Sequence, residues 1–186
     1  TQVGAVAMAY ASLHKLVEIH ADAERGAHDP ETPHTVVVLR DPATVDRTTL
    51  RGALTTPDLA LPELAPEVLA DPHLFDGVDL VVPTSGSTSG VPRLVGLSTE
   101  ALLASALATQ MVLSGPGNWI LALPAHHVAG AQVLFRAALA GTSPQVVDTS
   151  RGFDPAALLP AVAGATHDGR PAYLSLVPAQ LRTCLE

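Results

Sequence analysis

Cysteine, aromatic residues and basic residues are all scarce in this 186-residue chain. The single cysteine, Cys184, excludes an internal disulfide, and a reducing cytoplasm is therefore the expected compartment. Only 3% of the residues are aromatic, so a buried core must be built from Ala, Val and Leu. Hydrophobic residues nevertheless make up 47% of the chain, which is enough for such a core and excludes wholesale disorder.

Basic residues are outnumbered, since 10 Lys and Arg stand against 18 Asp and Glu and the formal net charge is −8. The basic residues are scattered and form no patch of the kind that nucleic-acid binding requires. No apolar run is long enough to span a membrane, and no signal peptide is visible. Nucleic acid and membranes are therefore not expected as partners. The chain starts at Thr1 rather than Met, from which we expect that its true N-terminus has been removed.

Residues 1–77 have a less regular pattern than the rest of the chain. Apolar residues recur at helical spacing over 4–23, which predicts a helix. The β-branched run at 36–39 predicts a short buried strand. The remainder is rich in Pro, Asp and Thr and predicts a winding connection with short helices near residues 44–54 and 62–70.

Strands and helices alternate regularly over residues 78–186. The expected strands lie at 78–82, 94–97, 119–123, 146–147 and 173–177. The expected helices run from Ser98 to about 113, from 128 to 140, from Asp154-Pro155 onward and from Pro178 onward. This alternation predicts βαβ units, and hence an α/β fold with a largely parallel sheet flanked by helices.

Ligands of such sheets bind at the carboxyl ends of the strands. The loops after Val82, Leu123 and Val177 all follow expected strands, so they are the expected place for a binding site.

The stretch Thr84-Ser85-Gly86-Ser87-Thr88-Ser89-Gly90-Val91-Pro92-Arg93 is the most informative part of the sequence. Its small residues allow the backbone to approach a ligand closely, and consecutive N–H groups in such a turn can form an anion-binding concavity. Its hydroxyl groups add donors, and Arg93 adds a planar cation. No acidic residue lies between Val81 and Thr99, and the loop therefore predicts polyphosphate binding.

Two sharper motifs are excluded in this loop. A Walker A loop requires a Gly-Lys-Ser/Thr ending that is absent, and a nucleophile elbow requires Ser where Thr88 stands. A flexible Ser/Gly linker is the alternative interpretation, because the composition alone fits one equally well. The apolar strands expected on both sides favour a structured loop.

The same stretch resembles the phosphate-binding signature of the adenylate-forming superfamily, whose usual form is Thr-Ser-Gly-Ser/Thr-Thr-Gly-x-Pro-Lys-Gly. Here Ser89 is an extra residue, Arg93 replaces the usual Lys, and Leu94 replaces the usual Gly. The resemblance implies that the chain is part of the large N-terminal α/β domain of such an enzyme. The residues that it assigns to the phosphates of ATP are Thr84, Ser85, Gly86, Ser87, Thr88, Gly90 and Arg93.

The segment Leu123-Pro124-Ala125-His126-His127-Val128-Ala129-Gly130 resembles the Leu-Pro-x-x-His-Val/Ile-Ser/Ala-Gly segment of o-succinylbenzoate–CoA ligases, a family of this superfamily. The resemblance places His127 beside the acyl carboxylate, as a catalytic and substrate-binding residue, with Gly130 as a second substrate contact. Without this resemblance, the two adjacent histidines could equally be ordinary loop residues. A metal site is disfavoured, because neighbouring side chains in an extended loop point apart and no carboxylate or Cys is nearby in the sequence.

The segment Tyr173-Leu174-Ser175-Leu176-Val177-Pro178-Ala179-Gln180-Leu181 resembles the Ser-Leu-Val-Pro-Thr-Gln-Leu segment of the same ligases. The resemblance implies that Ser175 and Gln180 line the acyl pocket. The alternative is that the segment is only a buried strand followed by a helix that begins with proline. The leucines are expected to be structural residues under both interpretations. The three motifs together span residues 80–185, and residues 1–77 carry no recognisable motif.

The resemblance implies an ATP-dependent acid–CoA ligase of menaquinone biosynthesis. A carboxylate would attack the α-phosphorus of ATP to give an acyl-adenylate and pyrophosphate, and CoA would then displace AMP. Mg²⁺ would help to neutralise the phosphates. The expected partners are therefore a small carboxylic acid, ATP and CoA. The oligomeric state is left open, a homo-oligomer included.

Members of the superfamily continue with adenine-binding and ribose-binding segments and a small C-terminal domain, none of which precedes Glu186. We therefore expect a C-terminally incomplete single domain that is inactive on its own. Two alternatives stay open. The chain could belong to another acyl-CoA synthetase or amino-acid adenylation domain, or it could be a non-catalytic module that binds ATP phosphates.

Overall fold

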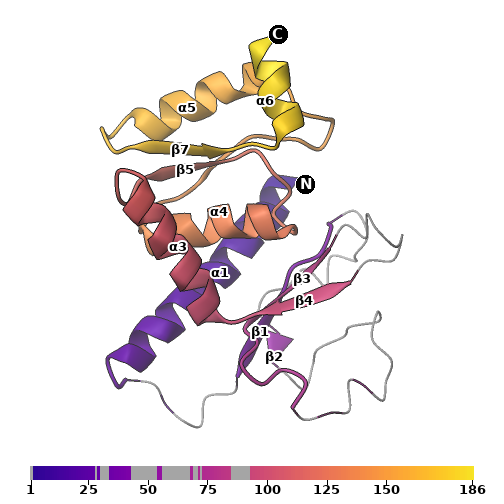
Figure 1. Cartoon of the computed structure of the whole chain (residues 1–186), viewed down its shortest axis with the longest axis vertical. Helices are drawn as coiled ribbons and strands as arrows, with labels where there is room; N and C mark the ends of the chain where they lie inside the picture. The colour runs from indigo at the N-terminus through magenta and orange to yellow at the C-terminus, as the bar shows by residue number, and fades with distance from the viewer. Residues whose placement is uncertain are drawn as a thin grey trace.

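The computed structural model describes residues 2–27, 29, 34–42, 54–55, 68, 71, 73–84 and 93–186. Their strands form two sheets, with a layer of helices between them and further helices on the outer side of the upper sheet (Figure 1). The fold class predicted from the sequence, α/β with parallel strands flanked by helices, is confirmed.

The first sheet has the strand order β2-β1-β3-β4. Its central strands, β1 (Thr35–Val38) and β3 (Leu80–Pro83), pair in parallel, with Val37 opposite Leu80. The edge strands, β2 (Leu54–Thr55) and β4 (Leu94–Leu97), run antiparallel to their neighbours. The apolar runs at Val36-Val37 and Leu80-Val81-Val82 are buried, as expected for strands that are covered on both faces.

The second sheet has the strand order β6-β5-β7 and is entirely parallel. Its strands are β5 (Asn118–Leu121), β6 (Gln145–Val146) and β7 (Ala172–Ser175). All four residues of β5 are buried, because helices cover both faces of this central strand. Trp119 and Leu121 face the large core, whereas Ile120 packs in a smaller core with Val147 and Ala161.

The helices of the middle layer are α1 (Gln2–Glu24), α3 (Thr99–Val112) and α4 (Val128–Leu139). On the outer side of the second sheet lie a 3₁₀ turn (Pro155–Ala157), α5 (Leu158–Thr166) and α6 (Pro178–Leu185). The predicted N-terminal signal of α3 is confirmed, since Ser98 Oγ accepts a hydrogen bond of 3.1 Å from the backbone N–H of Ala101. Asp154 likewise accepts one of 3.0 Å from the N–H of Ala156.

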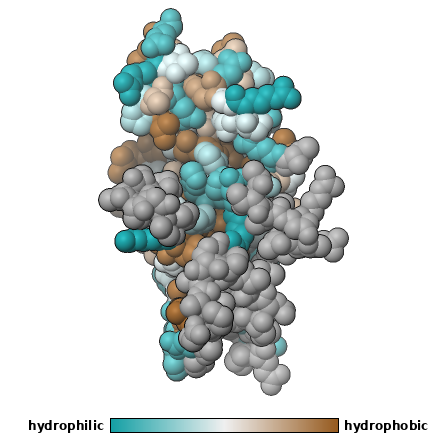
Figure 2. All heavy atoms as spheres, turned by 90° about the vertical axis from the view of Figure 1, so that its right-hand side faces the viewer, coloured by the Kyte–Doolittle hydropathy of each residue, from teal (hydrophilic) through white to brown (hydrophobic). Residues whose placement is uncertain are grey.

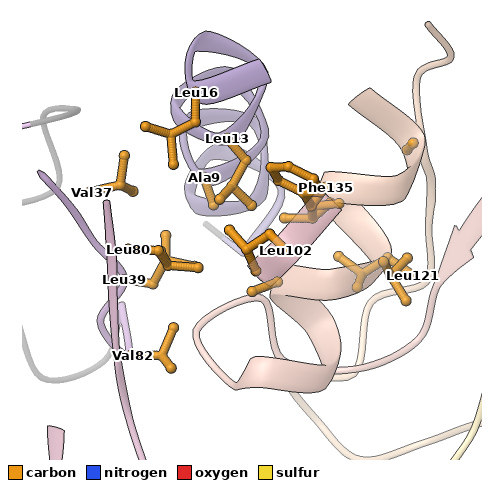
Figure 3. Close-up of a cluster of buried hydrophobic side chains, with 14 of the residues drawn as sticks. Ala9, Leu13, Leu16, Val37, Leu39, Leu80, Val82, Leu102, Leu121 and Phe135 are labelled. Atoms are coloured by element: carbon orange, nitrogen blue, oxygen red, sulfur yellow. The ribbon is translucent and has the colours of Figure 1, made fainter. Parts of the chain in front are cut away.

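The large core joins the first sheet, the helix layer and β5. Side chains from α1, the first sheet, α3 and α4 point toward one another, among them Leu13, Leu80, Leu102 and Phe135 (Figure 3). Each of these four side chains is almost completely inaccessible to solvent. Phe135 and Trp119 are the aromatic residues among the buried members of this core, and the other buried members are aliphatic, as the composition predicted.

Most of the predicted elements are confirmed, with bounds that differ by a few residues. The helix predicted for residues 4–23 is α1, and those predicted from 98, 128 and 178 are α3, α4 and α6. The division into two sheets was not predicted, because alternating strands and helices do not say which strands are neighbours. β4 runs antiparallel to β3, and the connection between Pro83 and Leu94 is too short for the crossover that a parallel pair requires.

The least regular part of the sequence is also the least described. The helix predicted for 44–54 lies mostly outside the described residues, and it is wrong at Leu54, which lies in β2. Of the helix predicted for 62–70, only Val68 is described, and it is helical. Among the described helices, none is both long enough and apolar enough to cross a membrane.

Candidate functional site

The carboxyl ends of β5 and β7 and the β3–β4 end of the first sheet lie on the same side of the molecule, at the right of Figure 1. Figure 2 looks onto this side and shows hydrophilic residues gathered at mid-height, with apolar residues above them. Three of the loops singled out in the sequence begin here: those after β3, β5 and β7. The fold therefore brings the described parts of the three motif segments to one side.

The ends of the predicted phosphate loop are held together by two hydrogen bonds. The backbone N–H of Thr84 donates to the carbonyl oxygen of Arg93 at 2.7 Å, and the N–H of Arg93 donates to Thr84 Oγ1 at 3.1 Å. Arg93 is exposed. Ser85, Gly86, Ser87, Thr88 and Gly90 lie outside the described residues, and their role in phosphate binding stays a prediction.

The two histidines differ in their surroundings. His127 is the exposed residue that precedes α4, and its side chain makes no capping hydrogen bond to the helix. The side chain of His126 is only 16% exposed, and its ring lies edge-on to that of His127 with 4.6 Å between the ring centroids. His127 is therefore the histidine that is open to an incoming molecule.

Burial and the neighbouring His127 both lower the pKa of His126 below its ordinary value. Asp41 opposes this shift, with its Oδ2 at 4.0 Å from Nε2 of His126. The buried imidazole is thus expected to be neutral at pH 7.

A cavity of about 490 Å³ lies beside His126. Its walls come from the first turns of α1, the end of β1, the loop after β5, and Thr149 and Ser150. The lining is mostly apolar, with a few polar groups such as Ser12, Asp41 and His126. This size and lining are typical of sites for small molecules. The sequence did not indicate the contribution of α1, because its inward residues follow an ordinary helical pattern.

Gly130, predicted as a substrate contact, is buried where α4 passes the loop after β5. A Cβ atom at this position would collide with the carbonyl oxygen of Pro124. A close approach of two backbone segments is therefore one reason for glycine here. Whether Gly130 also contacts a substrate stays a prediction.

Ser175 and Gln180, the other two predicted pocket residues, lie at the end of β7 and in the first turn of α6. Ser175 is partly buried and pairs with Leu121 in the ladder. The side-chain amide of Gln180 hydrogen-bonds to the backbone of Val177 and of Ala122. The substrate contacts of both residues remain predictions.

Arg136 on α4 is a partly buried cation that the motif search missed. Its guanidinium lies 5.3 Å from the centre of the Trp119 ring, and Nη2 is 3.4 Å from Ser105 Oγ. Burial lowers its pKa, and no carboxylate of the described residues forms an ion pair with it. Its Nε and Oε1 of nearby Gln132 are buried without a hydrogen-bond partner among the described residues. The sequence signal that could have indicated Arg136 is a single arginine within the apolar run of one predicted helix.

No protein-family model matches the chain. Two curated proteins from two strains of Mycobacterium tuberculosis, each named as a probable 2-succinylbenzoate–CoA ligase, are each 46% identical to it over 113 residues. The match covers 61% of this chain and 29% of each relative, so the chain spans well under half of their length. The predicted resemblance to this family of ligases is confirmed by these relatives.

Similar solved structures include the o-succinylbenzoate CoA synthetase MenE of Bacillus subtilis in complex with its acyl-adenylate intermediate. It has a TM-score of 0.48 and 23% identity, over 60% of this chain and 28% of that one. The same enzyme with ATP and magnesium ion has a TM-score of 0.49 and 22% identity, over 60% of this chain and 22% of that one. These likenesses are too partial to bear on function.

Proposed function

We propose that the chain is the phosphate-binding and acyl-binding part of an ATP-dependent ligase that joins o-succinylbenzoate to CoA through an acyl-adenylate. The supporting observation is that the described parts of the three motif segments, which follow β3, β5 and β7, lie on one side of the fold. The name of the 46% identical relatives supports the choice of acid. Because ATP and CoA are its cosubstrates, the cytoplasm is the proposed compartment.

In this proposal the loop from Thr84 to Arg93 holds the β- and γ-phosphates of ATP. The hydrogen bonds between Thr84 and Arg93 support this role, because they hold the two ends of the loop together before the nucleotide binds, which lowers the entropy lost on binding. The cation of Arg93 balances the charge that develops on pyrophosphate as the acid attacks the α-phosphorus. No protein nucleophile is required, so the protein contributes by orientation and charge.

Mg²⁺ would supply further charge neutralisation at the phosphates when it is bound. The described residues hold no group of three or more His, Cys, Asp or Glu side chains that could bind a metal. This is compatible with Mg²⁺, which commonly binds through substrate phosphates and water and needs few protein ligands. Of the two loop residues that the structure describes, Thr84 is the one with a side-chain oxygen that could take part.

The acid would bind at the start of α4, where His127 precedes the first turn of the helix and is exposed. The proposed acid carries two carboxylates, of which only one reacts, and we assign the reacting one to His127.

Pyrophosphate release by the full-length protein tests the proposal. With ATP, Mg²⁺ and a panel of acids, o-succinylbenzoate should give the highest kcat/KM, and CoA should then yield the thioester. Preference for a fatty acid or an amino acid would point to another acyl-CoA synthetase or to an amino-acid adenylation domain. ATP binding without pyrophosphate release from any acid would identify a non-catalytic phosphate-binding module instead.

A further inference from the structure

The side chain of Gln180 connects the ends of two neighbouring parallel strands. Its Nε2 donates a hydrogen bond of 2.8 Å to the carbonyl oxygen of Ala122, which follows β5. Its Oε1 accepts one of 3.0 Å from the backbone N–H of Val177, which follows β7. Because one neighbour is an acceptor and the other a donor, only one orientation of the amide satisfies both.

This connection lies where the backbone ladder stops. The last paired residues of β5 and β7 are Leu121 and Ser175. Ala122 is 1% exposed, so its carbonyl oxygen would be a buried acceptor in need of another partner if the bond to Gln180 were removed. The side chain of Gln180 therefore adds one further hydrogen-bonded link between the two strands, beyond the last backbone pair.

The segment that begins at Ala122 leads directly to the histidine pair. At its far end, the N–H of His127 donates to the carbonyl oxygen of Pro124 at 3.2 Å, and the same carbonyl packs against Gly130. The loop is thus held at one end by the start of α4 and at the other by Gln180. A change at Gln180 should move the histidines even though its side chain is bonded elsewhere.

We propose that Gln180 is a positioning residue that holds the loop of His126 and His127 in place by joining Ala122 to the start of α6. The proposal rests on the proposed function, because the loop matters for catalysis only if His127 meets the acid there. It also gives the amide a role other than direct contact with the substrate, since its oxygen and one of its N–H groups are bonded to the backbone.

The first test is the pKa of His126, measured by NMR titration of the 186-residue chain. Gln180→Met keeps a long, flexible side chain without the two hydrogen bonds, and Gln180→Asn keeps the amide but is one methylene too short to reach Ala122. Both should let water reach His126 and raise its pKa toward the ordinary value of about 6.5. Thr183→Ala is the matched control, because it removes a hydrogen bond within α6 only.

A structural role confined to α6 would lower the melting temperature in all three variants and leave the pKa of His126 unchanged. An unchanged pKa in both Gln180 variants would overturn the proposal. Using two variants keeps the test decisive if one of them fails to fold.

The second test uses the full-length protein. Gln180→Met should lower kcat for pyrophosphate release about tenfold or more and leave KM for ATP unchanged, because misplacing a reacting group slows the reaction without weakening phosphate binding. Thr183→Ala should leave both unchanged. An unaltered kcat in Gln180→Met would count against the positioning role. Absence of pyrophosphate release in the unmodified protein would overturn the proposed function, while the NMR titration would still judge the role of Gln180.

Discussion

The carboxylate of Asp79 accepts a hydrogen bond of 2.6 Å from the backbone N–H of Thr99, the first residue of α3. Its other oxygen lies 2.8 Å from Nε2 of His34, just before β1. One side chain therefore ties the beginnings of β1, β3 and α3 together. Burial works to raise its pKa, but the hydrogen bonds from His34 and Thr99 outweigh burial, and the pKa of Asp79 lies below its ordinary value.

This lowered pKa makes stability depend on pH. Since the folded state favours the ionised carboxylate, its contribution is present above the ordinary pKa of about 3.9 and is lost as the pH falls through the lower, folded value. Asp79→Asn should reduce the free energy of unfolding at pH 7 by about 1–3 kcal/mol. Urea unfolding from pH 3 to 7 should show the difference shrinking in acid. Asp22→Asn, at an exposed ion pair, is the control.

Arg93→Ala in the full-length protein should weaken the adenylation step by about 2–4 kcal/mol in kcat/KM, if its contact with the phosphates strengthens in the transition state. Arg93→Lys should be milder, because the charge is retained. The same assay with Arg151→Ala, at another exposed arginine, should show no change. Unchanged pyrophosphate release in Arg93→Ala would reject a role for this residue.

His127→Ala should reduce activity strongly with little loss of stability, because the side chain is exposed. His126→Ala should instead lower the melting temperature, because its side chain is mostly buried beside the cavity. Thermal unfolding and pyrophosphate release, measured on both variants, separate the two roles. Equal losses of activity, or a larger one at His126, would contradict the motif alignment.

Arg136→Met should leave the free energy of unfolding unchanged or raise it, since a partly buried cation without an ion pair is replaced by an apolar side chain of similar length. Chemical denaturation measures this difference. Arg182→Met on α6, at an exposed arginine, is the control. A loss of stability in Arg136→Met alone would show that the contacts of Arg136 with Trp119 and Ser105 stabilise the chain.

Gly130→Ala should destabilise the chain by about 2 kcal/mol, because the added methyl group meets the backbone of Pro124. Gly164→Ala is a matched helical control, since its methyl group would meet only the flexible end of Gln145. That variant should stay within about 1 kcal/mol of the unmodified chain, because Ala favours a helix more than Gly does. Comparable losses in chemical denaturation would show that close packing at Pro124 is not the cause.

The parts that could be predicted from the sequence are those in which a local pattern determines the structure. Ser98 identified the start of α3 because its side chain bonds to the first turn of the same helix. The alternation of strands and helices predicted the α/β class for the same reason. The pairing of β1 with β3 could not be predicted, because it depends on which strands meet in space.

The candidate site shows the same division. The motif residues could be recognised in the sequence from their identity and spacing, and the fold brings the described parts of their loops to one side. The bonding of Gln180 to Ala122 and the lack of a counter-ion at Arg136 depend on contacts between segments far apart in the chain. No pattern within a single segment contains that information.

Most residues of α4 are buried, among them Gly130, Ala131, Val133, Leu134, Phe135, Ala137 and Ala138. A helix enclosed in this way cannot shift without disrupting the core, so its amide hydrogens should exchange only when the whole domain unfolds. His127 stands at the end of this rigid element. Any closure around a substrate must therefore come from segments that move toward the histidine, while the histidine itself serves as the fixed point of the motion.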